Sequence, residues 1–193
     1  MRKLAVEDIK DLRAYERERD EFRRRIIELK RRRRIALGTI MSLVFENTET
    51  MRWQVQEMAR VERMLRDEQI AHEVDTYNQL IPDAGELSAT LLIELGSKEQ
   101  LMEWLPKLVG IHRSIAFVLA DGSEIPGNAA DEERLTREEV TPSVHFLKFS
   151  FTPEQVGVFE SGSVRIVSRH PAYREEVILT DDQRAELLGD LRA

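Results

Sequence analysis

Residues 46 to 78 most constrain the fold, because their apolar positions recur at the spacing of one face of an α-helix. The stripe consists of Met51, Val55, Met58, Val61 and Leu65. Glu62 falls inside the stripe, and Gln69 and His72 continue it. The pattern predicts one helix to about Asp75. A carboxylate that faces a core needs a partner, so Glu62 predicts a second polar group opposite this helix.

Residues 5 to 35 predict the helix that supplies this partner. The apolar seam of this helix comprises Leu12, Tyr15, Phe22, Ile26 and Leu29. Arg19 and Arg33 lie on the same seam. Gly38 ends the helix, and residues 39 to 45 alternate as a strand. Two long helices joined through one strand predict a helical hairpin over residues 1 to 82, in which Arg19 and Glu62 form a buried ion pair that sets the register.

The polar residues of the second helix also allow a functional interpretation. In this alternative Gln69 and His72 line a pocket, or Glu68, His72 and Asp75 share a helix face and bind a metal ion. A di-iron bundle would need Glu-x-x-His on two helices, whereas position 69 is glutamine and only one helix offers ligands. We therefore expect no bound cofactor and keep a metal held by His72 and carboxylates as the alternative.

One basic cluster stands out in a chain of net charge -7. Its members are Arg23, Arg24, Arg25, Lys30, Arg31, Arg32, Arg33 and Arg34. Such a cluster can bind RNA or phosphate through counterion release. It can equally be a solvated helix face that complements the helix C-terminus and meets acidic groups elsewhere. The acidic net charge and the lack of interleaved aromatic residues favour the second interpretation.

Residues 83 to 193 predict an α+β domain that forms one unit with the hairpin. Alternating apolar residues predict strands near 87–95, 115–119, 143–151 and 164–170. Ser97 with Gln100, and Thr152 with Gln155, are capping boxes that predict a helix in each intervening segment. The expected fold class is α+β, with a mixed β-sheet built from two strand-helix-strand units. Residues 121 to 142 are acidic and rich in turn residues, so we expect a surface loop there.

Composition excludes several classes of function. The chain has no cysteine, which removes disulfides, thiolate nucleophiles and iron–sulfur ligation. It has no apolar run long enough to span a membrane and opens without an export signal, so we expect a cytoplasmic protein. Nucleophile-elbow, phosphate-loop and dinucleotide-binding motifs are missing, which favours a protein without its own catalytic activity. His112, His145 and His170 lie on other elements, and no spacing brings them together.

Several segments together resemble one bacterial family, known as domain of unknown function three-five-zero-one. These segments are VEDIKDLRAYERERDEFRRR, LVFENTETMRWQVQEMARVERM, DEQIAHEVDTYNQLIP, ELSATLLIEL, HPAY and LLGDL. Family members are often encoded beside a rubrerythrin-like di-iron protein and an iron–sulfur oxidoreductase. The resemblance implies an accessory protein that binds such a partner in oxidative-stress defence or electron transfer. It assigns no catalytic residues, and the sequence leaves homo-oligomer formation open.

Overall fold

The computed structural model describes residues 1–129 and 140–193. Its helical elements are η1 (Val6–Asp8), α1 (Leu12–Arg33), α2 (Thr48–Val61), α3 (Asp67–Asn78), α4 (Lys98–Trp104), η2 (Ile111–Ser114), α5 (Pro153–Ser161) and α6 (Asp181–Leu191). Its strands are β1 (Arg34–Leu37), β2 (Met41–Glu46), β3 (Glu86–Ile93), β4 (Ile115–Val118), β5 (Glu124–Pro126), β6 (Asn128–Ala129), β7 (Val144–Ser150), β8 (Arg165–His170) and β9 (Tyr173–Ile178). No helix in these two ranges is long and apolar enough to cross a membrane.

The strands form two sheets, with the orders β1-β2-β3-β7-β6 and β5-β4-β8-β9. The α+β class is therefore confirmed, but the single mixed sheet is wrong, since every described pairing is antiparallel. In each strand-helix-strand unit, the first strand joins the five-stranded sheet and the second joins the four-stranded sheet. The connecting helices therefore link two sheets, whereas a mixed sheet would need both strands of a unit in one sheet.

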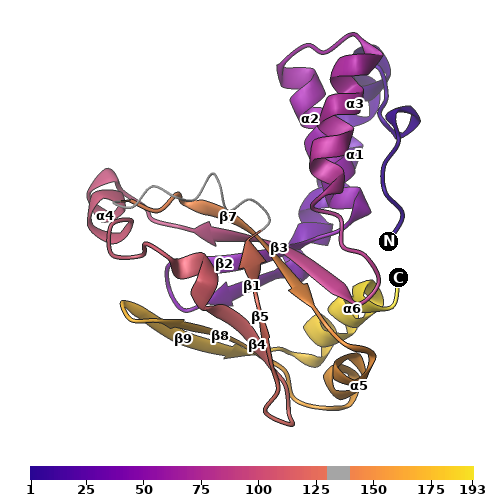
Figure 1. The fold of residues 1–193 in the computed structure, drawn as a ribbon. Helices are drawn as coiled ribbons and strands as arrows, with labels where there is room; N and C mark the ends of the chain where they lie inside the picture. The colour runs from indigo at the N-terminus through magenta and orange to yellow at the C-terminus, as the bar shows by residue number, and fades with distance from the viewer. Residues whose placement is uncertain (130–139) are drawn as a thin grey trace.

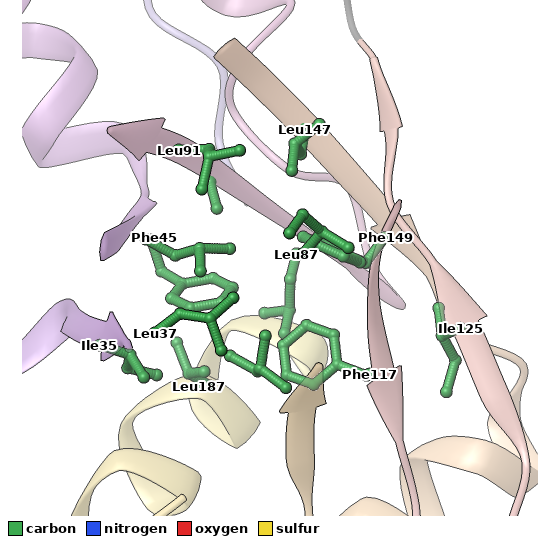
Figure 2. Packing of buried hydrophobic residues seen from close by; sticks show 14 of the residues in the cluster. Ile35, Leu37, Phe45, Leu87, Leu91, Phe117, Ile125, Leu147, Phe149 and Leu187 are labelled. Atoms are coloured by element: carbon green, nitrogen blue, oxygen red, sulfur yellow. The ribbon is translucent and has the colours of Figure 1, made fainter. Parts of the chain in front are cut away.

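The main core lies between the two sheets, where alternate residues of each strand point inward. Phe117 is central, with its ring centroid 4.9 Å from that of Phe149 and 5.8 Å from that of Phe45. Figure 2 shows these rings packed together beside Leu87, with Leu187 of α6 close to them. Leu87, Ala89, Leu91 and Ile93 of β3 are buried as expected. Ser88 and Thr90 on the opposite face are buried as well, so the alternation does not mark a solvent-exposed face of this strand.

The β1–β2 hairpin corrects the expected course of residues 34 to 45. The predicted helix ends at Arg33, and β1 pairs with β2 as Ile35 opposite Leu43. Gly38 turns the hairpin with φ of +68°, and a side chain there would collide with the Tyr173 hydroxyl. That hydroxyl donates to Leu37 O at 2.8 Å and accepts from Ile40 N at 3.2 Å. Tyr173 thus fastens an edge of one sheet to an edge of the other.

The expected loop at residues 121 to 142 is also corrected, because β5 and β6 fall inside it. Gly127 separates these short strands, which belong to different sheets, and its amide donates to Ile115 O at 2.8 Å. A side chain at Gly127 would press on the Phe149 ring. The segment therefore crosses from one sheet to the other. Residues 130–139 of the expected loop lie outside the described residues.

Helices α1, α2 and α3 form a helical arm that projects from the sheets (Figure 1). One of its small cores contains Leu4, Met51, Val55, Val74, Leu80 and Ile81, and Phe146 of β7 packs against this core. A boundary at residue 82 would separate β2 from β3, although these strands are hydrogen-bonded neighbours in one sheet. The chain ends lie side by side at the base of the arm, where the amino group of Met1 donates to Ala193 O at 3.3 Å.

Candidate functional site

The seam between α1 and α2 is aromatic. Tyr15, Phe22 and Ile26 of α1 are buried as expected, and Trp53 of α2 packs against them. The centroids of the Phe22 and Trp53 rings are 5.3 Å apart, and Tyr15 contacts both rings edge-on. Edge-to-face contacts of this kind hold aromatic rings in a preferred geometry. α1 and α2 therefore pack against each other along this aromatic seam.

Arg19 lies in this seam, but its partner is Glu57 and not Glu62. Arg19 Nε donates to one carboxylate oxygen of Glu57 at 2.8 Å, and a second guanidinium nitrogen donates to the other oxygen at 2.9 Å. The Tyr15 hydroxyl also donates to Glu57. The hydrogen bonds from Arg19 lower the pKa of Glu57, although burial opposes them. The predicted buried pair of Arg19 with Glu62 is wrong because α2 ends at Val61, which leaves Glu62 exposed at its C-cap.

We expect Glu57→Ala to lower the free energy of unfolding by about 1 to 2 kcal/mol, since it removes a charge-assisted, partly buried set of hydrogen bonds. Glu62→Ala is the matched control on the same helix end, and it should change the stability by less than about 0.5 kcal/mol, as surface substitutions do. Urea denaturation of both variants measures the difference. Equal losses would contradict the assignment of Glu57 as the partner of Arg19.

A tight turn separates α2 from α3, where the sequence predicts one continuous helix. Arg63 has φ of +52°, the left-handed region that a residue with a side chain enters at a cost of about 1 to 2 kcal/mol. Met64 N donates to Ala59 O at 2.9 Å, and Glu62 N donates to Met58 O at 2.9 Å. These bonds satisfy the carbonyl groups of Met58 and Ala59 in the last turn of α2. The turn is thus a well-defined helix stop.

The turn places apolar side chains in solvent at the outer end of the arm. Val61 is 69% exposed and Leu65 is 80% exposed, whereas the predicted stripe would bury both. Together with half-buried Leu12 of α1 they line a groove of about 510 Å³. We call this groove the arm tip. Its remaining lining residues are Glu16, Arg60 and Arg63.

Charges at the arm tip are partly neutralised. Arg60 Nε donates to a Glu16 carboxylate oxygen at 2.5 Å, which joins α2 to α1 beside the apolar groove. Arg63 is exposed and makes no ion pair with any described residue within 4 Å. The arm tip therefore combines an apolar floor with one guanidinium that is available to a ligand.

Sequence reasoning missed the arm tip because it extended the helical period through residues 62 to 66. One signal favoured a break there: Asp67 and Glu68 are consecutive acidic residues, and they form the first turn of α3. Acidic residues are favoured at a helix N-terminus because they interact with the helix dipole. If a new helix is predicted to begin at residue 67, Val61 and Leu65 no longer belong to one continuous buried stripe, and their side chains can be exposed.

The predicted pocket and metal residues all lie on α3. Gln69 is half-buried and its amide oxygen is 3.5 Å from Arg66 Nε, while His72 is exposed. Glu68 and Asp75 are exposed as well. Within residues 1–129 and 140–193, no group of three or more histidine and carboxylate side chains is placed to hold a metal ion. The structure therefore does not bring Glu68, His72 and Asp75 together as ligands.

The residues of the predicted basic patch do not all face solvent. Arg33 is only 2% exposed, so it is not part of a solvent-facing patch. Arg34 pairs with Glu94 at 2.6 Å and Arg31 with Glu28 at 2.7 Å. Arg32 lies 3.7 Å from Glu186, and the Arg25 guanidinium lies over the Phe22 ring. Of the predicted cluster, the four residues from Arg31 to Arg34 therefore meet acidic groups of the fold. Arg23, Arg24 and Lys30 complete the predicted set.

His112 and His145, which no sequence spacing brought together, contact each other in the structure. The rings of His112 and His145 stack with centroids 5.4 Å apart, and both residues are buried. The Thr141 hydroxyl and His145 Nε2 are 3.2 Å apart. Burial, and then the neighbouring His112, lower the pKa of His145 to about 4. His170 lies elsewhere, with Nε2 donating to Val109 O at 3.0 Å.

These features define an α+β protein with two antiparallel sheets and a projecting helical arm. Residues 3–191 match the family model described as "Protein of unknown function (DUF3501)", and the chain belongs to this family. A crystal structure of a novel protein of unknown function from Burkholderia pseudomallei is similar, with 32% identity and a TM-score of 0.91. The match covers 98% of this chain and 100% of that chain. No curated protein matches this chain. The family resemblance seen in the sequence is thereby confirmed.

Proposed function

We propose that this chain is a cytoplasmic partner-binding protein, and that the arm tip binds the partner. The observation that carries this proposal is the exposure of Val61 and Leu65 beside Leu12, on a turn held by backbone hydrogen bonds. Exposed apolar groups that gather in one place mark interaction sites more often than scattered ones do. A rigid turn also loses little conformational entropy when it binds.

The arm tip suits a protein segment that carries an apolar side chain next to a carboxylate. The apolar side chain would fill the groove between Leu12, Val61 and Leu65. The carboxylate would pair with Arg63, whereas Arg60 is already paired with Glu16. The family resemblance suggests a rubrerythrin-like di-iron protein or an iron–sulfur oxidoreductase as the partner. In that case the redox centres belong to the partner, which is compatible with a chain that has no cysteine.

We expect Leu65→Ser and Val61→Ser each to weaken the complex with such a partner by about tenfold or more. Burying an aliphatic side chain contributes about 1.5 to 3 kcal/mol, and 1.4 kcal/mol corresponds to a factor of ten in affinity. Calorimetric titration of each purified partner with wild type and variants measures the effect. Both side chains are exposed, so the variants should keep the stability of the wild type.

Ile178→Ser is the matched control, because Ile178 is an apolar residue with 62% exposure on β9, away from the arm. It should leave the affinity unchanged. Arg63→Asn tests the charge without breaking the turn, since asparagine tolerates the left-handed conformation. Binding that is equally strong in all variants, or no binding of either partner by the wild type, would contradict the proposal.

A further inference from the structure

A second concave site lies on the side of the arm, where three segments of the chain meet. It is a pocket of about 300 Å³ between α1, α2 and the segment that precedes α1. Tyr15, Glu18, Phe22 and Arg25 line it from α1. Arg52 and Gln56 come from α2, and Asp8 and Lys10 come from the preceding segment. The volume lies at the lower end of the range for small-molecule sites.

The walls of this pocket are held in place by hydrogen bonds across the segments. Gln56 is 2% exposed, and its side chain makes two bonds to the backbone of Lys10: Lys10 N donates to Gln56 Oε1 at 2.9 Å, and Gln56 Nε2 donates to Lys10 O at 2.8 Å. Phe22 is packed against Tyr15 and Trp53. The pocket is therefore pre-formed, which favours binding of a small ligand.

Two guanidinium groups lie over one aromatic ring of the pocket. The guanidinium carbon of Arg52 is 4.7 Å from the Phe22 ring centroid, and that of Arg25 is 5.3 Å from it. Each contact is a cation–π interaction, but the two like charges repel each other. Nε of Arg52 is buried and makes no hydrogen bond within the described part of the chain. Arg25 forms no ion pair within 4 Å in the described part of the chain. Its charge contributes to the lowered pKa of Glu18, whose main cause is the hydrogen bond from Lys10.

The two acidic residues that line the pocket, Asp8 and Glu18, are paired with cations other than Arg25 and Arg52. Asp8 accepts two hydrogen bonds from Arg2, at 2.7 and 2.9 Å, and a further one from Ala5 N at 2.8 Å. Glu18 pairs with Lys10. Glu49 accepts one bond from Arg52 at 2.9 Å, which leaves Nε of that guanidinium without a partner. The pocket thus carries more positive than negative charge.

We infer that this pocket binds a small oxyanion, either a phosphate group or a carboxylate, between Arg25 and Arg52. An oxyanion accepts several hydrogen bonds from guanidinium forks and removes the repulsion between the two arginines. Arg25 is exposed, so its side chain can move toward the anion, whereas Arg52 is held by Glu49 and the Phe22 ring. The size of the pocket restricts the ligand to a small metabolite or the free ion.

Trp53 provides the readout, because its ring is 5.3 Å from the Phe22 ring at the base of the pocket. The chain has two tryptophans, so a Trp104→Phe background isolates the Trp53 signal. Inorganic phosphate and acetate are titrated separately, with chloride at matched ionic strength as the reference. The phosphate titration tests for a phosphate ligand, and the acetate titration tests for a carboxylate ligand. We expect at least one of them, and not chloride, to give a saturable change in Trp53 fluorescence and a matching calorimetric isotherm.

Arg25→Gln should weaken this binding at least tenfold, and it leaves the fold intact because Arg25 is exposed. Arg52→Gln should weaken it at least as much, with circular dichroism to check folding. Arg17→Gln is the matched control, because Arg17 is an exposed arginine of α1 outside the pocket lining. Signals equal to those of chloride, or the same affinity in Arg25→Gln as in Arg17→Gln, would overturn the assignment. The proposed partner binding at the arm tip does not depend on this result.

Discussion

Replacing Arg33 with methionine is expected to lower the free energy of unfolding by about 3 to 5 kcal/mol, because it leaves the buried carboxylate of Asp190 without its counter-charge. Arg33 Nε donates to Phe45 O at 2.8 Å, and a second nitrogen donates to Glu186 at 3.0 Å. The same guanidinium pairs with Asp190, which is only 6% exposed. One side chain therefore connects the end of α1, the end of β2 and α6.

Arg32→Met is the matched control for this prediction. Its side chain is 54% exposed and lies 3.7 Å from Glu186, so the substitution should change the stability by less than about 1 kcal/mol. Urea denaturation of both variants gives the comparison. Burial raises the pKa of Asp190 although Arg33 opposes it, so the loss of Arg33 should raise that pKa further. A loss in Arg33→Met as small as that in Arg32→Met would contradict the role assigned to the buried cluster.

Lowering the pH from 7 to 4 is expected to remove up to about 3 kcal/mol of stability through His145 alone. Its pKa is about 4 in the folded state because of burial, whereas an unfolded histidine has a pKa of about 6.5. Between these values the unfolded chain binds a proton that the folded chain does not bind. Stability therefore rises with pH across this window, by about 1.4 kcal/mol for each unit of pKa difference.

His145→Gln separates this effect from the titration of other groups. The variant should be less stable at pH 7, because it loses the stack on His112 and alters the contact with Thr141. Its stability should nevertheless depend less on pH between 4 and 6.5 than that of the wild type, by up to about 3 kcal/mol over the window. Urea denaturation at several pH values measures both curves. Parallel curves would show that His145 does not titrate as its burial implies.

Local patterns along the chain predicted many elements correctly. The apolar seam of α1 buries Tyr15, Phe22 and Ile26 as expected. Thr152 and Ser97 cap the helices that follow them, and each accepts a hydrogen bond from the amide three residues on. These features depend on contacts within a few residues, or on the repeat of one helix or strand. Such contacts are encoded in the residue types and their spacing.

Side-chain pairing between segments could not be predicted in the same way. Arg19 faces Glu57 because α1 and α2 meet in one particular register. Glu57 and Glu62 are five residues apart, about 1.4 helical turns, so they point to different sides of the helix axis. Arg33 has the same residue type as its exposed neighbours in the basic cluster. Only the packing of α6 and β2 around it makes it a buried structural residue.

The candidate site was predictable only in part. The sequence shows that Val61 and Leu65 are apolar residues at helical spacing. This spacing does not distinguish a buried side chain from an exposed one. The exposure of Val61 and Leu65 follows from the left-handed turn at Arg63. An arginine in a sequence does not indicate the end of a helix, whereas a glycine often does. The pocket between Arg25 and Arg52 likewise needs two helices and the preceding segment to come together.

The sequence alone therefore predicted the α+β class, many of the helices and strands, and the face that α1 buries, and it carried the resemblance to the family. The class, the elements and the buried face follow from residue order, caps and periodicity, whereas the family follows from the resemblance of whole segments. The tertiary structure decided that the strands divide between two antiparallel sheets, that α2 stops before Glu62, and which charges are buried. Each of these depends on segments distant in the chain, whose relative placement is set by the packing of the whole molecule.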